Sequence, residues 1–476
     1  MEKGASARAL FAGLAALALA AAMLAIWWPG VAMYDTIDQY HQAVTGAYED
    51  WHPPVMARLW SLLLPFGGGQ APMFVLQTAL YAAGLGLLAA RLAQGGGWRR
   101  SAAVLAIGAW PLFSGWEGVV LKDAQMAAAL VAATGLAGWW RLAGRRLPLA
   151  AAAAIILLLL YALLVRGNAV FAVVPLALAL FGWPRLNHPL ARAAAALAAV
   201  AALLALAPLV NHRLLGAAET GIERTLPTYD LAGIAHFAGA QAVPALPPEA
   251  WAGIEARDCY RPFFWDTFGD ARRCGFIHDG LDEAAPAGAL SRLWVGTIVR
   301  HPIAYAEHRL GHWNATLRWL VPRNWPVAAP PSESEPNDAG LVSPGGAAAC
   351  AAALADWIGA TPFGWPILWF AASLAVLALA GPSQGPAPAL AFALALSAAV
   401  LEASFAAISI SADLRYHLWP MLATALAWTL LAGTPLPRRG LWIAGLALAL
   451  LLAGGVASRL LLAPAGGTYG AMLGTE

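Results

Sequence analysis

The first apolar segment of the chain reads ARALFAGLAALALAAAMLAIWW and covers residues 7–28. It is long enough and apolar enough to cross a bilayer as a helix. Its apolar part exceeds that of a typical signal peptide, and no convincing cleavage site precedes the polar residues that follow it. We therefore interpret it as a retained membrane anchor, followed by a polar loop at residues 29–56 that lies at a membrane face.

The composition extends this interpretation to the whole chain. Hydrophobic residues make up 60% of the 476 residues and charged residues 11%, with a mean hydropathy of +0.64. Soluble proteins have about 45–50% apolar and about 25% charged residues. These values predict an all-α polytopic membrane protein. The net charge is only +2, and the basic residues are scattered in pairs, so we expect no nucleic-acid partner.

Further apolar segments predict about eleven transmembrane helices in total. They lie at residues 7–28, 70–94, 101–115, 122–140, 148–165, 169–183, 190–211, 358–380, 387–408, 415–433 and 440–461. Several of them are shorter than the roughly 20 residues that a spanning helix needs. Their ends are therefore imprecise, and one or two of them could be broken helices.

The basic residues of the short connections predict the orientation. If the segments alternate in direction, the basic clusters all fall on one side, which the positive-inside rule assigns to the cytoplasm. These residues are Lys3, Arg8, Arg99, Arg100, Arg141, Arg145, Arg146, Arg185, Arg438 and Arg439. Nearly all acids and histidines belong to the opposite connections, at residues 29–56, 115–123, 166–168, 212–357 and 409–414. We therefore expect a polar outer face.

The longest outer connection divides the chain into three parts. Residues 1–211 form an N-terminal transmembrane module, which includes the outer loop 29–56. Residues 212–357 form a small, mostly helical cap, and residues 358–476 form a C-terminal transmembrane module. Within the cap, the pair His301-Pro302 predicts the end or a kink of a helix, because proline cannot continue the hydrogen-bond ladder.

The cap also holds two cysteines, Cys259 and Cys274. If the cap faces an oxidising compartment, they could form a disulfide. Two unpaired thiols in a loop fit the sequence equally well.

The first outer loop carries two carboxylates at helical spacing. Asp35 and Asp38 are three residues apart, so on a helix they share one face, and Gln39 lies one step around it. Two converging carboxylates could deprotonate an acceptor hydroxyl, hold a divalent cation, or divide these roles. The alternative is a solvated loop in which the aspartates cap a helix. His52, which precedes two prolines, is by itself more often a structural hydrogen-bonding residue than a catalyst.

Two more outer connections carry basic residues. Lys122 could bind a phosphate that Asp123 orients, or the two could form a simple interfacial ion pair. Arg166 lies between two apolar segments, where its guanidinium is a suitable fork for a phosphate. It could instead only extend toward the lipid headgroups.

A fourth polar cluster stands at the outer start of the segment 415–433. Ionisable groups that enter a membrane helix cost a few kcal/mol each, so their presence favours a function. We predict Arg415 as a phosphate contact, with Tyr416 as its packing or hydrogen-bonding partner. The competing interpretation is a salt bridge between Asp413 and Arg415 that only stabilises the helix bundle.

These motifs resemble the GT-C superfamily of membrane glycosyltransferases in their order along the chain and in their common position on the outer side. The resemblance is to bacterial relatives of the dolichyl-phosphate-mannose protein mannosyltransferases and of the aminoarabinose lipid A transferase. It rests on YDTIDQ at residues 34–39, DWHPPV at 50–55 and RYHLWP at 415–420. Members often have an acidic Asp-Glu pair where this chain has Asp35-Thr36. The arrangement of apolar segments and polar loops matches over most of the chain, whereas individual residues match only in these stretches.

The resemblance implies a GT-C-like fold in the bacterial inner membrane with an active site facing the periplasm. A sugar would pass, with inversion, from a polyprenyl-phosphate donor to a lipid or glycan acceptor. Asp35 would be the general base, and Asp38 a helper or the ligand of a divalent cation. The resemblance and the charges together assign substrate or phosphate binding to Gln39, His52, Lys122, Asp123, Arg166, Arg415 and Tyr416.

Two other function classes remain open at this point. A transporter or flippase would place ionisable residues near the bilayer midplane and would show an internal repeat, whereas the acids of this chain gather on one face. A polymerase or ligase of lipid-linked glycans would share the compartment and the substrate. The discriminating feature is position: a transferase should bring Asp35 and Arg415 into one cavity that opens sideways to lipid, and a ligase should rely on a His/Arg pair in the long loop.

Overall fold

The computed structural model describes residues 2–181, 188–244, 246, 248–270, 272–284, 288–326, 328–381, 383 and 385–466. Arg185, one of the predicted cytoplasmic arginines, lies outside these ranges. Within them, the secondary structure is helical, with isolated β-bridges but no strand. The chain divides into two compact units. Unit 1 comprises Met1–Thr220, Ala328–Glu402 and Arg415–Leu452, and unit 2 comprises Gly221–Val327, Ala403–Leu414 and Ala453–Glu476.

Among the described residues, five helical segments are long and apolar enough to cross a membrane. They are Gly4–Trp27 in α1 (Glu2–Trp27), α4 (Ala71–Gln94), Pro189–Leu214, which includes α10 (Pro189–Pro208), α19 (Pro386–Ile408) and α21 (Arg438–Leu461). They indicate a membrane protein, as the composition predicts. The larger number of about eleven spans stays a prediction, because the other apolar helices are shorter or less apolar than a span requires.

Except for α17, most of which lies in the predicted cap, these other helices also coincide with predicted apolar segments. They are α5 (Trp98–Gly108), α6 (Pro111–Trp116), α7 (Lys122–Arg141), α8 (Leu149–Val165), α9 (Val170–Phe181), α17 (Gly346–Ala360), α18 (Pro366–Ala380) and α20 (Leu418–Leu431). Two of the predicted segments are broken, and proline marks both breaks. Pro111 starts α6 after α5, and Pro362 follows the end of α17, because a proline nitrogen has no hydrogen to donate to the preceding turn.

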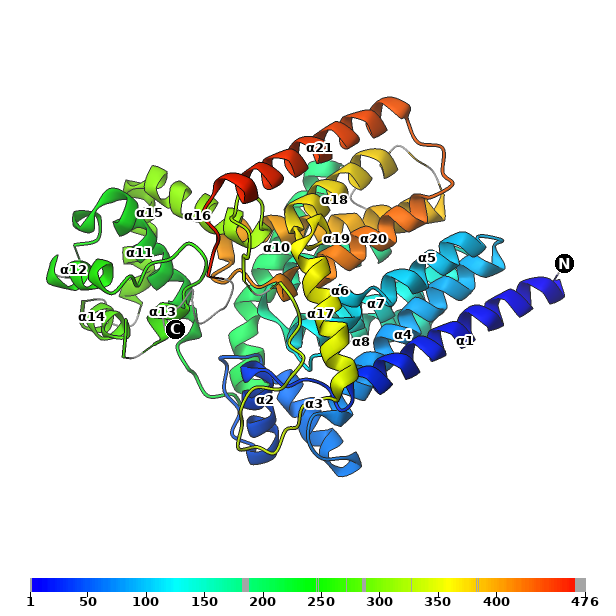
Figure 1. Cartoon of the computed structure of the whole chain (residues 1–476), viewed down its shortest axis with the longest axis horizontal. Helices are drawn as coiled ribbons and strands as arrows, with labels where there is room; N and C mark the ends of the chain where they lie inside the picture. The colour runs from blue at the N-terminus through cyan, green and yellow to red at the C-terminus, as the bar shows by residue number, and fades with distance from the viewer. Residues whose placement is uncertain are drawn as a thin grey trace. The chain divides into compact units, whose positions relative to one another are not determined.

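Helix α4 packs against α1, α5 and α7 (Figure 1). The contact between α4 and α7 is a backbone contact. A Cβ at Gly84 would lie 2.4 Å from the carbonyl oxygen of Val131, and a Cβ at Gly135 would lie 2.1 Å from that of Gly84. Such an approach suits helices in lipid, where van der Waals packing of small residues drives association. This packing fixes α7, whose first residue is Lys122.

Unit 2 contains most of the predicted cap. Its helices are α11 (Thr225–Ala238), α12 (Pro248–Ala256), α13 (Asp266–Gly269), α14 (Phe276–Ala284), α15 (Ala289–Arg300) and α16 (Pro302–Leu317). Helix α11 packs against α15 and α16. The predicted helix end at His301-Pro302 is confirmed, since α15 stops at Arg300 and α16 starts at Pro302. The two ends of the predicted cap, residues 212–220 and 328–357, belong to unit 1 instead.

A disulfide joins Cys259 to Cys274 in unit 2, with 5.9 Å between their Cα atoms. Both sulfur-bearing side chains are fully buried, in a core that also contains Tyr229 and Phe268. Of the two alternatives that the sequence leaves open, the structure has the bonded pair.

Replacing this pair should destabilise unit 2. The bond closes a loop across a sequence separation of 15 residues, and loops of that size gain about 3 kcal/mol from a disulfide. We expect the double substitution Cys259→Ser/Cys274→Ser to lower the thermal unfolding midpoint, measured by scanning fluorimetry. Cys350→Ser, which removes the exposed free cysteine, is the matched control and should leave the midpoint unchanged. Equal effects of the two would contradict the expectation.

Candidate functional site

Hydrogen bonds join the loop after α1 to the residues that precede α7. The amide of Val31 donates to the carbonyl of Gly118 at 3.0 Å, and the amide of Val120 donates to the carbonyl of Val31 at 2.9 Å. Thr36, in the first turn of α2 (Tyr34–Thr45), donates its hydroxyl to the carbonyl of Val120 at 2.7 Å. These bonds bring the start of α2, with Asp35, beside the start of α7, with Lys122.

Gly30 makes this close approach possible. Its φ of +102° lies in a region that other residues rarely adopt, and a Cβ there would lie 2.8 Å from a methyl carbon of Val120. The side-chain amide of Gln70 donates to the Gly30 carbonyl at 3.0 Å and so holds the turn. A larger residue at this position would displace the loop that carries Asp35.

Asp35 is the centre of a cluster of basic groups. Its Oδ2 lies 3.3 Å from Nζ of Lys122 and 3.2 Å from Nη1 of Arg415, and its Oδ1 lies 3.7 Å from Nε2 of His52. Lys122 Nζ also lies 2.5 Å from Nδ1 of His52. The Asp35 side chain keeps 22% of its surface exposed. An ion pair is thus formed between residues that lie far apart in the sequence, and the carboxylate stays reachable.

A second ion pair lies beside the first. Arg166 pairs with Asp123, whose side chain is buried. The guanidinium of Arg166 lies 4.2 Å from the ring centre of Tyr416, and that of Arg415 lies 5.2 Å from the same ring. Cations attract the face of an aromatic ring, so Tyr416 links both arginines. The residues predicted to contact a phosphate therefore lie close together, although Lys122 pairs with Asp35 rather than with Asp123.

The segment that carries Arg415 is anchored by a buried pair. His417 Nδ1 lies 2.8 Å from a carboxylate oxygen of Glu402, and both side chains are fully buried. Arg415 to His417 form a short turn that leads into α20. Breaking a buried pair of this kind is strongly destabilising, so the pair keeps this turn, and with it Arg415, in place. Sequence reasoning did not identify this pair, because its two residues are 15 positions apart in the chain.

The loop before His52 has a similar anchor. Asp50 Oδ1 accepts the amide of Thr220 at 2.7 Å and its hydroxyl at 2.6 Å, and Asp50 Oδ2 lies 2.9 Å from Nε2 of His212. Helix α3 (Val55–Leu63) begins immediately afterwards. His52 is thereby held between an anchored aspartate and a helix start. Sequence reasoning missed this role of Asp50, whose partners lie far along the chain.

The charges of the cluster determine its protonation. Burial alone would raise the pKa of Asp35, but the cations Arg415 and Lys122 outweigh burial and hold this pKa well below its usual value. Burial, together with the charge of Lys122, lowers the pKa of His52 to about 3. His52 is therefore neutral at pH 7, and its Nδ1 can accept a hydrogen bond from the Lys122 ammonium. Asp35 is ionised at the same pH.

Asp38 and Gln39 lie apart from this cluster. Asp38 accepts a hydrogen bond from the side chain of Gln42 at 2.8 Å. Burial raises the pKa of Asp38, and the negative charge of Asp35 adds to the rise. Gln39 is buried, and among the described residues neither atom of its amide group has a hydrogen-bond partner. The predicted pair of carboxylates shares a helix, but the two carboxylates differ in surroundings.

The arrangement of side chains at this site gives little support for binding of a divalent cation. Within the described part of the chain, no group of three or more His, Cys, Asp or Glu side chains is suited to hold a metal ion. The Asp35 carboxylate faces an ammonium and a guanidinium, and both would repel a metal ion. The site is instead suited to a ligand with negative charge.

The pKa values of Asp50 and Asp38 are shifted in opposite directions, which predicts opposite effects of pH on the stability that each contributes. Hydrogen bonds from Thr220 and His212 outweigh burial and lower the pKa of Asp50, whereas the pKa of Asp38 is raised. A lowered carboxyl pKa contributes stability that is present above the unfolded value, about 3.9 for aspartate. This contribution is lost as the pH falls through the folded value. A raised carboxyl pKa contributes stability at pH values below the pKa of the unfolded state, and this contribution is lost as the pH rises through the folded pKa.

Thermal unfolding at a series of pH values tests this difference. We expect Asp50→Asn to lower the unfolding midpoint at pH 7 and to weaken its fall below about pH 4. Asp38→Asn is the matched control, because it removes a carboxylate whose ionisation costs stability in the fold. It should leave the midpoint at pH 7 equal to that of the wild type or above it. The same fall in both variants would be inconsistent with the assigned shifts.

Unit 2 has a polar network of its own. Asp230 pairs with His308 at 2.9 Å and with Arg309, and it accepts a hydrogen bond from the indole of Trp294 at 2.8 Å. The second ring nitrogen of His308 lies 2.8 Å from the hydroxyl of Tyr260. Asp230 and His308 are fully buried. This His/Arg pair is thus surrounded by partners and stabilises the unit.

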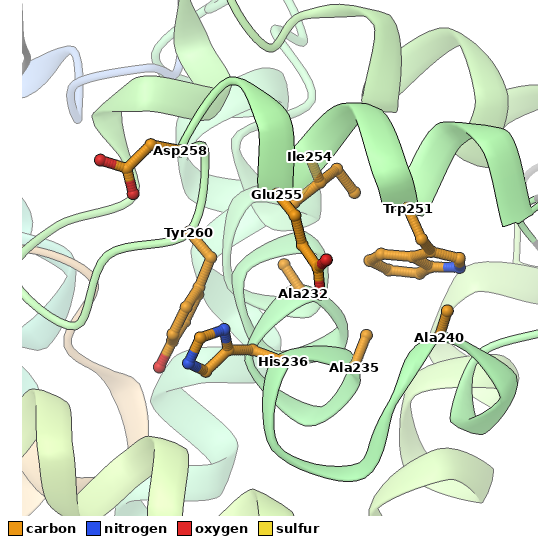
Figure 2. Close-up of a pocket in the computed structure, with 9 residues that line it drawn as sticks. All are labelled: Ala232, Ala235, His236, Ala240, Trp251, Ile254, Glu255, Asp258 and Tyr260. Carbon is orange, nitrogen blue, oxygen red and sulfur yellow. The ribbon is translucent and has the colours of Figure 1, made fainter.

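A hollow of about 170 Å³ lies beside this network (Figure 2). Figure 2 shows the ring of His236 against that of Tyr260, with the Glu255 carboxylate and the Trp251 indole on the other side. The ring centres of His236 and Tyr260 are 4.7 Å apart. None of the site residues predicted from the sequence lines this hollow.

Comparison of the chain with protein-family models and with curated protein sequences finds no match.

Proposed function

We propose that the chain is a membrane glycosyltransferase that moves a sugar from a polyprenyl-phosphate donor to a lipid or glycan acceptor. The observation that supports this most is the contact of Asp35 with both Lys122 and Arg415. The reaction needs a base and cations that stabilise an anionic leaving group, and this cluster contains both. The similarity of the motifs to GT-C enzymes agrees with this reaction.

The proposed reaction assigns one step to each group. The acceptor oxygen attacks the anomeric carbon from the face opposite to the phosphate, and its proton passes to the carboxylate of Asp35. The bond between the anomeric carbon and the phosphate oxygen breaks, and polyprenyl phosphate leaves with the electron pair. Lys122, Arg415 and Arg166 stabilise the negative charge that develops on this oxygen. The sugar is thereby transferred with inversion.

The lowered pKa of Asp35 fits a base that is activated by the donor. Lys122 and Arg415 neutralise the carboxylate, which makes it a weak base. A bound phosphate would compete for the same two cations, so that each attracts Asp35 less. The pKa of Asp35 then rises toward the range in which a carboxylate accepts a proton effectively. Donor binding would therefore precede proton abstraction.

The rival functions have less support. A glycan ligase would use a His/Arg pair of the long loop, but His308 and Arg309 are buried and paired with Asp230. A transporter would have ionisable groups along its path. Glu402, which lies in the apolar helix α19, is buried against His417, an arrangement that suits helix packing. We further propose that the site faces the periplasm of a bacterial inner membrane, which agrees with the disulfide, since disulfides persist in oxidising compartments.

Binding of polyprenyl phosphate tests the proposal without knowledge of the sugar, because all such donors leave this product. We expect the purified protein in nanodiscs to bind polyprenyl phosphate far more tightly than polyprenol of the same length. Lys122→Gln should reduce this preference, and Arg438→Gln/Arg439→Gln should preserve it, because those two arginines are exposed at the start of α21. Equal binding of the two lipids to the wild type would overturn the proposal.

A further inference from the structure

A second cluster of basic residues lies at the other end of α7. Arg141 is the last residue of this helix, and Arg145 and Arg146 follow in the turn before α8. Because α7 has 20 residues and rises 1.5 Å per residue, about 30 Å of helix separates Lys122 from Arg141. This length equals the thickness of the hydrocarbon core of a bilayer. The cluster therefore lies at the end of α7 that the positive-inside rule assigns to the cytoplasmic face, opposite to the predicted face of Asp35.

The three arginines line a cavity of about 550 Å³ in unit 1. Its other walls come from the first turns of α8 and α19 and from the last turn of α9. These walls are apolar: Leu147, Ala152, Ala179, Leu180, Phe181, Pro386, Ala389 and Leu390. A cavity with a cationic edge and apolar walls matches a molecule that has an anionic head and a hydrocarbon tail.

The arginines lack counter-charges in the described structure. No acidic residue lines the cavity, and within the described ranges none of the three side chains has an ion pair or a hydrogen-bond partner. Nε of Arg141 is buried nonetheless. A buried polar nitrogen without a partner costs free energy, and an external anion would remove this cost. The starts of α8 and α19 add the positive ends of two helix dipoles.

We propose that this cavity binds the phosphate headgroup of an anionic phospholipid, with the acyl chains along the apolar walls. Arg141 contacts the phosphate from the helix end, and Arg145 and Arg146 attract it from the exposed side. Basic pockets between membrane helices bind anionic headgroups in this way on the cytoplasmic side, which agrees with the orientation that the arginines predict. This site is independent of the transfer reaction and of the Asp35 cluster.

Native mass spectrometry with added phosphatidylglycerol and phosphatidylcholine tests the site. We expect the wild type to bind the first molecule of phosphatidylglycerol more tightly than phosphatidylcholine. Because one arginine near the surface changes such binding about five-fold, Arg145→Gln/Arg146→Gln should weaken phosphatidylglycerol binding about thirty-fold. Arg438→Gln/Arg439→Gln removes the same charge from exposed residues that do not line the cavity, and it should leave this affinity within two-fold of the wild type, roughly.

Further arms of the experiment separate the alternatives. Arg145→Lys/Arg146→Lys keeps the charge and should retain most of the affinity, which excludes a simple loss of folding as the cause. Inorganic phosphate should fail to displace the lipid, because it cannot occupy the apolar walls. An equal loss in the two glutamine variants, no preference between the two lipids, or displacement by inorganic phosphate would each overturn the proposal.

Discussion

Asp35→Asn is expected to reduce sugar transfer by about 10²–10⁴-fold, the range that a general base contributes. The substitution removes the proton acceptor while it preserves the shape of the side chain. The measurement is release of polyprenyl phosphate from a polyprenyl-phosphate-sugar donor by purified protein in nanodiscs. This expectation depends on the proposed function.

Binding of the lipid product distinguishes a chemical role of Asp35 from a structural one. Without the Asp35 charge, Lys122 and Arg415 have one anionic partner fewer. Polyprenyl phosphate should therefore bind Asp35→Asn as tightly as the wild type or more tightly. A loss of transfer with retained binding is the signature of a missing base. Loss of both, with a lower unfolding midpoint, would instead assign Asp35 to the support of the fold.

Asp38→Asn is the matched control for this experiment. Asp38 lies on the same helix, but its carboxylate bonds to Gln42 and not to the cations of the cluster. We expect transfer by this variant to stay within a few-fold of the wild type. If Asp38→Asn lost as much activity as Asp35→Asn, the two carboxylates would act together, as the sequence alone suggested.

The sequence predicted which residues form the site better than it predicted which of them pair with one another. Tyr34–Thr45 forms the helix that the spacing of Asp35 and Asp38 requires. Arg415 contacts Asp35, and neither residue lines one of the two cavities described above. The choice of partner for each charge was not evident, because it depends on contacts between distant segments. Lys122 and Asp123 are neighbours in sequence, yet each faces a different partner, since successive residues of a helix point in directions about 100° apart.

Helix ends were also hard to predict. The predicted segment 101–115 becomes two helices, because Pro111 interrupts the hydrogen-bond ladder. Helix α17 (Gly346–Ala360) was assigned largely to the cap, since its alanines and glycines give weak signals of a membrane segment. The anchors of the site, such as Asp50 with Thr220, depend on the folded chain and leave no local pattern. Composition and charge therefore predict a membrane protein and one polar face, and tertiary contacts determine the rest.

Arg415→Ala is expected to lower transfer by about 10²–10³-fold, the loss that follows removal of one donor to a developing negative charge. It should also weaken binding of polyprenyl phosphate, which Asp35→Asn should not do. Arg415→Lys keeps the charge but loses the planar fork that binds a phosphate through two hydrogen bonds. We expect this variant to be intermediate. Full activity in Arg415→Ala would remove Arg415 from the proposed mechanism.

The pH dependence of transfer gives an independent test of the same residue. Burial acts to raise the pKa of Asp35, and the charge of Arg415 is the largest effect that opposes it. Removing this charge should raise the pKa of Asp35 and leave more of it protonated in acid. Because only the ionised carboxylate accepts a proton, the residual activity of Arg415→Ala should decline at a higher pH than that of the wild type. Arg415→Lys should keep the wild-type acid limb, because its ammonium still favours the ionised carboxylate. An unshifted acid limb in Arg415→Ala would mean that the base is a residue other than Asp35.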